Sequence, residues 1–282
     1  MTRATTTESA RLRAYRRAHF EQITARAEPF AHGVAVFTPA HPTKWDLNLL
    51  VVDDAAGTSA AELIEEAERL QAPAGLRHRK VEVLHGGDAL VQGFETAGGW
   101  AAERLTVMAL RGADVRGTAE ADVREVEFEA IRPLMIAWYG ESMSEAEAHD
   151  LADSDADTAS AAGARFFLVE RDGEPAACCT LLGHDGVGQV EEVYTAAAHR
   201  GHGLASAVIR TAIAASRERG DDLVMIMADA DDWPQRLYER LGFEIVDVYR
   251  TFTKKPPTQS AFHPHSPSPR AGSARRRRRP QL

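Results

Sequence analysis

The stretch that most constrains the fold of this chain lies at residues 190–220. Val193 belongs to a short run of strand-favouring residues, and a turn that contains Gly201 and Gly203 follows it. Apolar residues then recur at helical spacing as far as Gly220, which stands where a helix should stop. Glycine permits a positive φ and a close approach of the backbone to a ligand. The predicted strand, turn and helix therefore present free N–H groups at a helix start, which suits a pyrophosphate.

Two patterns in this part of the chain resemble a known family. Arg200-x-x-Gly203-x-Ala205 after a strand is similar to the acetyl-CoA loop of the GCN5-related N-acetyltransferase (GNAT) superfamily, whose pattern is Gln/Arg-x-x-Gly-x-Gly/Ala. Further along, Leu237-Tyr238-Glu239-Arg240-Leu241-Gly242-Phe243-Glu244 resembles the closing helix and strand of that family. An apolar strand is predicted between the two patterns, at residues 223–227. The resemblance covers roughly residues 123–253.

The resemblance implies acetyl-CoA as co-substrate. We predict no metal, because His263 and His265 of the tail have no ligand spacing with the two cysteines. Strand backbone groups would pair with the pantetheine arm, and the glycine turn would hold the pyrophosphate. The residues that it assigns to the cofactor are Val193, Tyr194, Thr195, Arg200, Gly201, His202, Gly203, Leu204, Ala205 and Asp231. Asp231 departs from the family, which often has Asn at this place. An ionised acid there accepts a hydrogen bond from pantetheine but cannot donate one.

Three residues are candidates for acid–base chemistry. By resemblance, Tyr238 lies near the CoA sulfur and protonates the leaving thiolate. An alkylammonium acceptor has a pKa near 10.4, so a base must take its proton. Glu191 and Glu192 precede the loop on its strand, and strand alternation predicts that they face opposite sides. Glu191, which shares parity with Val193 and Thr195, is the favoured base; two solvated acids at a strand edge are the alternative.

The first part of the chain repeats the order of predicted elements found in the second. Its predicted strands and helices lie at residues 47–52, 60–71, 81–84, 88–97 and 103–110. We interpret residues 1–111 as a degenerate GNAT-like lobe, an arrangement similar to tandem-GNAT enzymes, although chance alternation of helices and strands is an alternative. Asp53-Asp54-Ala55-Ala56-Gly57 stands in place of the glycine loop. Two carboxylates there repel a pyrophosphate, so we expect one cofactor site per chain.

The remaining pattern predicts an α/β (α+β) fold of two GNAT-like lobes, each a mixed, mostly antiparallel sheet flanked by helices. The domains are a first lobe at residues 1–111, a linker at 112–122, a catalytic lobe at 123–255 and a disordered basic tail at 256–282. Other predicted elements are a helix at 8–27, strands at 33–37 and 123–128, helices at 128–138 and 144–151, a polar loop at 153–163, and a hairpin of residues 165–170 and 174–182 across Asp172-Gly173.

Charge is distributed unevenly along the chain. The sequence has 33 basic and 42 acidic side chains, and its last 29 residues hold eight of the basic and none of the acidic ones. The body of the protein is therefore acidic, which favours cationic acceptors and argues against nucleic-acid binding. The arginine run Arg275-Arg276-Arg277-Arg278-Arg279 is the exception, since it is either a solvated tail or a polyanion-binding segment.

The remaining observations concern location and function. Cys178 and Cys179 adjoin in an apolar strand and are expected to be reduced thiols, which is consistent with a cytoplasmic protein. No membrane-spanning stretch and no signal peptide are predicted. The expected function is transfer of an acetyl group to a primary amine of a small molecule or peptide, by direct attack. A non-catalytic acyl-CoA-binding or partner-binding module is the alternative; the oligomeric state is left open.

Overall fold

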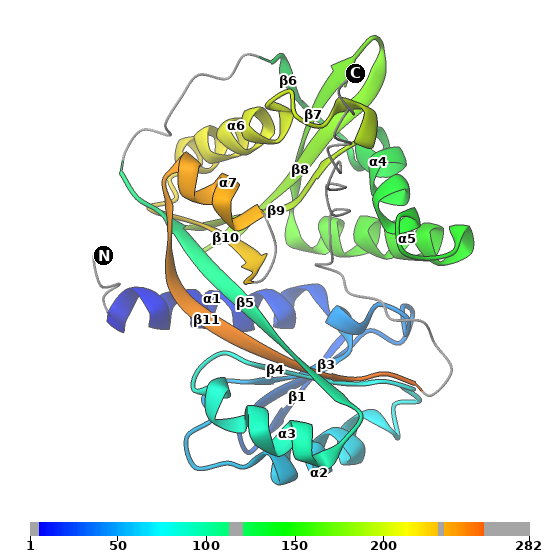
Figure 1. The fold of residues 1–282 in the computed structure, drawn as a ribbon, viewed down its shortest axis with the longest axis vertical. Coiled ribbons are helices and arrows are strands. Elements are labelled where there is room, and N and C mark those ends of the chain that lie inside the picture. Colours follow the sequence, from blue (N-terminus) through cyan, green and yellow to red (C-terminus); the bar gives the residue numbers. More distant parts are fainter. Residues whose placement is uncertain (1–5, 113–120, 231–233, 257–282) are drawn as a thin grey trace, which may run out of the picture.

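The computed structural model describes residues 6–112, 121–230 and 234–256. Eleven strands form one sheet in the order β1-β2-β3-β4-β11-β5-β10-β9-β8-β7-β6 (Figure 1). The strands are β1 (Arg26–Phe30), β2 (Gly33–Phe37), β3 (Leu49–Val52), β4 (Arg79–Val83), β5 (Trp100–Leu110), β6 (Val123–Val126), β7 (Arg165–Arg171), β8 (Glu174–His184), β9 (Val187–Thr195), β10 (Leu223–Asp229) and β11 (Phe243–Lys254). Most of the predicted linker, Asp231 and nearly all of the predicted tail lie outside the described residues.

Helices cover both faces of this sheet. They are α1 (Thr6–Ile23), α2 (Ala60–Gln71), α3 (Val91–Ala97), α4 (Phe128–Gly140), α5 (Glu145–Ala162), α6 (Leu204–Glu218) and α7 (Pro234–Leu241), with 3-10 turns η1 (Trp45–Leu47), η2 (Gly87–Leu90) and η3 (Ala197–His199). In the second half, Cys179 packs with α6 and α7, whereas its neighbour Cys178 packs with α4 and α5. Strand alternation thus gives β8 two buried faces, which explains why it reads as a continuous apolar run.

The long strands β5 and β11 join the two halves into one sheet. β11 follows α7 of the second half, yet its far end pairs with β4 of the first half, with Arg250 opposite Val83. β5 belongs by sequence to the first half, yet it pairs with β10, with Ala109 opposite Met225. The halves have therefore exchanged their last strands, β5 and β11, which pair with each other and connect the two halves in Figure 1. The exchange was not predicted from the sequence, and the domain boundaries at residues 111 and 123 remain predictions.

The two halves share an order of elements. β3 and β4 are parallel strands joined through α2, and β9 and β10 are parallel strands joined through α6. A second helix and a long strand follow in each case, namely α3 with β5 and α7 with β11. The other strand pairs are antiparallel, so the predicted mixed, mostly antiparallel sheet flanked by helices is confirmed. That the first half is a degenerate copy of the second remains a prediction.

Local sequence signals mark two helix starts and one hairpin turn. Ser59 and Ser144 begin α2 and α5 with capping boxes. Asp172 and Gly173 both have positive φ, as the predicted two-residue hairpin turn requires. The predicted loop at residues 153–163 is wrong, because α5 continues to Ala162. Asp155 within this segment is buried and ion-paired, so tertiary contacts override its weak helix propensity.

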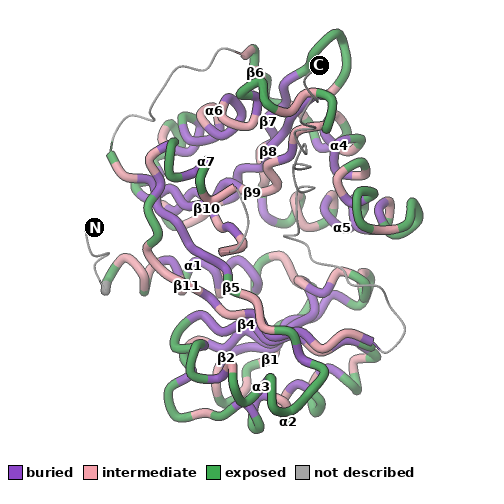
Figure 2. The backbone as a smooth tube through the Cα atoms, in the orientation of Figure 1, coloured by how far each residue is buried: buried purple, intermediate pink, exposed green. Residues whose placement is uncertain are grey.

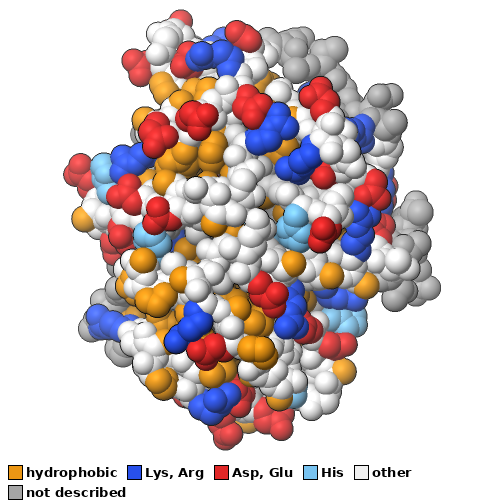
Figure 3. Space-filling model, turned by 180° about the vertical axis from the view of Figure 1, so that it is seen from behind, with side chains coloured by type: hydrophobic (Ala, Val, Ile, Leu, Met, Phe, Trp, Pro, Cys, Tyr) orange, Lys and Arg blue, Asp and Glu red, His pale blue; other side chains and the backbone are white. Residues whose placement is uncertain are grey.

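Burial follows the sheet. Figure 2 shows buried residues along the central strands of both halves and exposed residues on the outer helix faces and loops. Helix α1 lies between the halves, and Leu12, Tyr15 and Phe20 on it pack against residues of both, including Leu84 and Met225. On the face seen in Figure 3, acidic and basic side chains are interspersed. Helix α1 therefore packs against both halves of the sheet, next to the site described below.

Candidate active site

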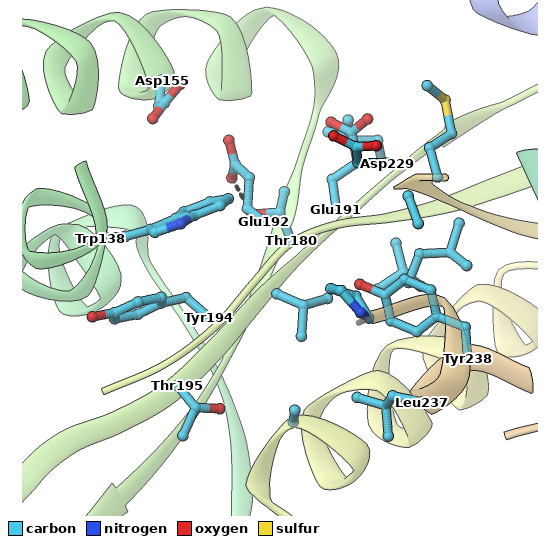
Figure 4. A pocket seen from close by; sticks show the side chains of 18 of the residues that line it. Trp138, Asp155, Thr180, Glu191, Glu192, Tyr194, Thr195, Asp229, Leu237 and Tyr238 are labelled. Carbon is cyan, nitrogen blue, oxygen red and sulfur yellow. Dashed lines mark hydrogen bonds between the residues drawn. The ribbon is translucent and has the colours of Figure 1, made fainter. Parts of the chain in front are cut away.

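A cavity of about 880 Å³ opens where the two halves meet. Its walls come from α1 and the segment around η1 in the first half, and from α4, α5, β8, β9, β10, α7 and the start of α6 in the second. In Figure 4, Glu191 and Glu192 on β9 and Asp155 on α5 point into this space. The rings of Trp138 and Tyr194 stack along one side, with centroids 5.9 Å apart. The cavity is thus lined by aromatic rings and carboxylates.

The cavity exists because two parallel strands separate. β9 and β10 pair between Val187 and Val190 on one strand and between Leu223 and Ile226 on the other. β9 then continues to Thr195 on its pairing with β8, while the pairing with β10 ends at Val190. The space between the diverging strands leads from the cavity to the start of α6. One edge of β9 therefore faces the cavity with its backbone polar groups.

The equivalent strands of the first half stay together. β3 and β4 pair up to Val52 and Val83, and the Leu84 amide then donates to the Val52 carbonyl over 2.9 Å. The Ala55 amide donates to the His85 carbonyl, also over 2.9 Å, so the pairing continues into the loop. This loop contains the acidic segment that stands in place of the glycine turn. The first half thus lacks, among its described residues, the strand separation that opens the second.

The glycine turn has the geometry that its sequence predicted. Gly201 and Gly203 have φ of 82° and 76°, in the left-handed region. An added Cβ at either position would meet no atom within 4 Å, so conformation and not crowding requires glycine. The first bond inside α6 runs from the Ala207 amide to the Gly203 carbonyl, over 3.1 Å. The amides of residues 204–206, all of which line the cavity, precede that bond and point out of the helix start.

Arg200 lies in the same turn but contacts a carboxylate. Its Nη2 is 2.5 Å from Glu141 Oε1, and its Nε donates to the Thr195 carbonyl over 3.0 Å. The Tyr194 hydroxyl also donates to Glu141 Oε1, over 2.8 Å. Burial and then this hydrogen bond to Glu141 raise the pKa of Tyr194 to about 12. Glu141, just after α4, thereby ties Tyr194 of β9 to Arg200 in the glycine turn.

Eight of the ten predicted cofactor residues line the cavity. These are Val193, Tyr194, Thr195, Arg200, Gly201, Gly203, Leu204 and Ala205. His202 is absent from the lining; it is exposed and its Nδ1 lies 3.2 Å from the His199 carbonyl oxygen. His199 itself lines the cavity. Asp231 lies outside the described residues.

Glu191 and Glu192 do not face opposite sides, contrary to the strict alternation assumed above. β9 pairs Glu191 with Thr180 and Tyr194 with Cys178, so two residues of β9 stand opposite Cys179 alone. This β-bulge carries Glu192 at φ 53°. Val190 before it and Val193 after it both pack toward α6, so the two glutamates between them share the other face. Both line the cavity.

Glu191 occupies a mostly buried position between the two halves. Its side chain is 24% exposed, and its Oε1 is 3.9 Å from Arg16 Nη1 on α1. Gln189 donates a short hydrogen bond to the same oxygen. Burial raises the pKa of Glu191 to about 7, against a lowering by Arg16 and a further raising by Glu192. A carboxylate that titrates near neutral pH suits a general base.

Glu192 belongs to a second polar group. The Thr180 hydroxyl donates to Glu192 Oε2 over 2.6 Å. Nearby, Lys44 of the first half forms a short ion pair with the buried Asp155, which also accepts a 2.6 Å bond from the Tyr139 hydroxyl. Burial lowers the pKa of Lys44 and raises that of Tyr139. The Lys44–Asp155 pair thus links the first half to α5 at the cavity wall.

Tyr238 lies on the opposite wall of the cavity. It is 6% exposed, and α7 holds its ring 6.3 Å from that of Phe243 at an angle of 62°. Figure 4 shows Tyr238 and Leu237 across the space from Trp138 and Tyr194. Tyr238 therefore lines the same cavity as the two glutamates, and its role in protonating the thiolate remains a prediction.

Several lining residues were not predicted from the sequence. Arg16, Lys44 and Asp46 come from the first half, and Asp155 and Asp229 come from the second. The first three carry no motif, and only the docking of α1 and η1 brings them to β9. Asp155 was assigned to a loop, although it follows Ala148, Leu151 and Ala152 at helical spacing, which was a usable signal for a helix.

Within the described residues, no group of three His, Cys, Asp or Glu side chains has the arrangement of a metal site. None of the helices described is both long and apolar enough to cross a membrane. His263 and His265 of the tail lie outside the described residues.

Comparison with known proteins places these features in context. Residues 129–243 match the model of the Acetyltransferase (GNAT) family. A GCN5-related N-acetyltransferase from Kribbella flavida has a similar structure, with a TM-score of 0.64 at 21% identity over 87% of this chain and 95% of that one. A functionally unknown conserved protein from Staphylococcus epidermidis ATCC 12228 gives a TM-score of 0.65 at 12% identity over 84% of this chain and 97% of that one. At these identities the likeness concerns the fold, and it extends over both halves. No curated protein matches the sequence.

Proposed function

We propose that this chain, whose residues 129–243 match the model of the Acetyltransferase (GNAT) family, acetylates a primary amine by direct attack on acetyl-CoA in the cavity between its halves. The family makes the protein an acyl-CoA-dependent N-acetyltransferase. The observation that carries the rest is the meeting, in one cavity, of a glycine-turn helix start, a strand edge and a carboxylate that titrates near pH 7.

The residues present fit acetyl-CoA as co-substrate. Gly201 and Gly203 leave open space in front of the α6 amides, which suits a pyrophosphate. The β9 edge at Val193, Tyr194 and Thr195 suits the amide groups of a pantetheine arm. Arg200 supplies a positive charge beside the turn, although it must be shared with Glu141. The thioester would then lie between this edge and Tyr238.

Glu191 is the proposed general base. At pH 7 only about one alkylamine in two and a half thousand is neutral, as follows from a pKa near 10.4. Glu191 removes the ammonium proton, directly or through water, and the amine nitrogen attacks the thioester carbonyl. The carbon–sulfur bond breaks, and Tyr238 protonates the departing thiolate. The nitrogen loses its second proton as the amide forms, and a proton from solvent restores the Tyr238 hydroxyl. Glu192 borders the same space, and we assign it to the acceptor side because Thr180 already holds one of its oxygens.

The acceptor is proposed to be cationic. Glu191 and Glu192 face the cavity together, and three of the four Lys and Arg side chains in its lining each form an ion pair with a protein carboxylate, namely Arg16, Lys44 and Arg200. The fourth is Arg240 on α7. Trp138 and Tyr194 add aromatic faces that attract ammonium groups. The acceptor is a small molecule or a peptide amine. We further propose a reducing, cytoplasmic location, because Cys178 and Cys179 are both buried free thiols.

An acetyl-CoA assay across acceptor classes tests this proposal. Release of free CoA would be followed with simple amines, aminoglycosides, amino acids and peptides that offer an N-terminus or a lysine, and acetylated products identified by mass. We expect turnover with at least one class and loss of turnover in Glu191→Gln. Tight acetyl-CoA binding without turnover on any class would favour the non-catalytic acyl-CoA-binding module. Retention of the full chain, but not of residues 1–255, on a polyanion column would assign a separate role to the arginine tail.

A further inference from the structure

Arg16 connects the first half of the chain to Glu191. It lies on α1, is 5% exposed, and spreads its guanidinium over two carboxylates. Nε is 2.8 Å from Glu82 Oε1 and Nη2 is 3.1 Å from Glu82 Oε2, which makes a bidentate pair with a residue of β4. The third nitrogen, Nη1, is 3.9 Å from Glu191 Oε1. Arg16 thus stands between a buried carboxylate of the first half and the proposed base of the second.

We propose that Arg16 is a positioning residue that sets how readily Glu191 takes a proton, and that Glu82 sets how much of the Arg16 charge Glu191 receives. This inference rests on the proposed role of Glu191 as base. Arg16 acts on the reaction only through that residue.

Other charged and titratable groups surround Glu191. They are Tyr15 and His19 on α1, Lys44 and Asp46 by η1, Tyr139 on α4, Asp155 on α5, Glu192 on β9 and Asp229 on β10. Lys44 is held by Asp155, and Asp46 is held by Lys80. His19 is buried, which lowers its pKa to about 3, so it is neutral at neutral pH. Among the described residues, Arg16 is therefore the cation that faces Glu191 through a nitrogen, Nη1, that takes no part in its pair with Glu82.

The electrostatic effect has a definite sign. A positive charge near a carboxylate favours its ionised form, by about one to three pKa units at ion-pair distance. Burial and Glu192 act in the opposite direction. Glu82 is 1% exposed and neutralises part of the Arg16 charge, so loss of Glu82 should strengthen the action of Arg16 on Glu191. Loss of Arg16 should then raise the pKa of Glu191 and loss of Glu82 should lower it. A mere loss of packing would not produce shifts of opposite sign in the two variants.

The test is a titration of the Glu191 carboxyl by NMR in the full chain without ligands. The protein carries ¹³C-labelled glutamate, and its Glu191 signal is assigned by comparison with Glu191→Gln. We expect Arg16→Gln to raise the Glu191 midpoint by about one pH unit or more. Arg16→Lys should restore most of the wild-type midpoint, and Glu82→Gln should lower it. Arg17→Gln is the matched control, because Arg17 lies on the same helix and pairs with Glu21 and Asp53 outside the cavity.

Equal midpoints in Arg16→Gln and Arg17→Gln would overturn the inference. If Arg16→Gln does not fold, Arg16→Lys, Glu82→Gln and the paired Arg16→Met with Glu82→Met decide the matter, since replacing both members of a buried ion pair is often tolerated. The paired variant should raise the Glu191 midpoint as Arg16→Gln would. The inference is also overturned if the paired variant leaves the Glu191 midpoint unchanged and Glu82→Gln does not lower it. The proposed function fails separately. If Glu191→Gln keeps full acetyl transfer, Glu191 is not the base, whatever Arg16 does to its midpoint.

Discussion

The carboxylates of Glu191 and Glu192 enter the same cavity although the two residues are consecutive on β9. The cause is the extra residue that β9 carries opposite Cys179, which turns Glu192 back to the face of Glu191. Two carboxylates on one face disfavour each other's ionisation, and Glu192 is one of the groups that raise the pKa of Glu191. The bulge therefore shapes the strand edge and also helps to set the basicity of the proposed base.

Glu191→Gln should lower kcat/KM by about 10²- to 10⁴-fold, the usual worth of general acid–base help. The loss should be largest between about pH 7, above which the wild-type Glu191 carboxylate is ionised, and the amine pKa near 10.4. Below about pH 7 the wild-type base is itself protonated, so the activities of wild type and variant should approach each other. Glu192→Gln should act mainly on the KM of the acceptor, because Thr180 already bonds its carboxylate. The measurement is a pH profile of both variants with the acceptor found in the panel. Small, equal losses would mean that neither is the base; a large loss in Glu192→Gln alone would move the role to Glu192.

Gly203→Asp should abolish most acetyl-CoA binding, because it puts a carboxylate at the helix start where the pyrophosphate is proposed to lie. Gly220→Asp is the matched control, since Gly220 also has a positive φ and open space but follows the other end of α6. Both variants place a side chain at a positive φ, so backbone strain should destabilise them similarly. Arg200→Ala should weaken binding less, since the backbone donors remain. Calorimetry that gave equal affinities for Gly203→Asp and wild type would remove the phosphate assignment.

Tyr238→Phe should lower kcat with little change in acetyl-CoA affinity, if the hydroxyl protonates the thiolate. The loss falls at or below the lower end of the 10²- to 10⁴-fold range, because a CoA thiolate is a tolerable leaving group. Tyr249→Phe is the control, since Tyr249 is fully buried on β11 and is not part of the cavity lining. Steady-state kinetics and calorimetry separate the two effects. Identical kcat values in the two variants would exclude the hydroxyl of Tyr238 from the reaction.

A saturating titration should give one acetyl-CoA per chain. Only β9 and β10 separate among the described parallel pairs, whereas β3 and β4 stay bonded as far as Ala55 and His85. The acidic segment Asp53-Asp54 adds repulsion at the start of α2. Native mass spectrometry or calorimetry measures the ratio. Two equivalents bound, with one surviving in Gly203→Asp, would place a second site in the first half.

The stability of the protein should report the titration of Glu191. Its pKa is about 7 when folded against a reference value of 4.5, so the folded state binds more protons between these values. The stabilisation by the bound proton is complete below about pH 4.5 and is lost as the pH rises through about 7. Gln cannot titrate, so Glu191→Gln does not lose this stabilisation. As the pH rises over that range, the free energy of unfolding of the variant should therefore increase relative to that of wild type by up to about 3 kcal/mol. Thermal unfolding at several pH values checks this, with Glu95→Gln on exposed α3 as control.

Much of the cofactor side of the site was predictable from the chain alone. Arg200, Gly203 and Ala205 are close in sequence, and the geometry that they need is local, namely two positive φ angles and a helix start. The same holds for the hairpin turn at Asp172-Gly173, where both residues have positive φ. Local conformation depends on neighbouring residues, so a pattern of neighbours was enough to predict it.

The acceptor side was decided by tertiary structure. Arg16 is far from Glu191 in sequence and carries no motif, and only the packing of α1 across the sheet brings Nη1 to 3.9 Å from Oε1. The exchange of β5 and β11 was equally hidden, because both strands have the same pattern whichever partner they pair with. Strand periodicity determined which residues alternate; it could not reveal the extra residue opposite Cys179, since a bulge is a property of two paired strands. The sequence by itself thus determined the glycine turn and helix start at which we propose that a phosphate binds, and the contacts between the two halves decided which groups surround Glu191, the proposed base.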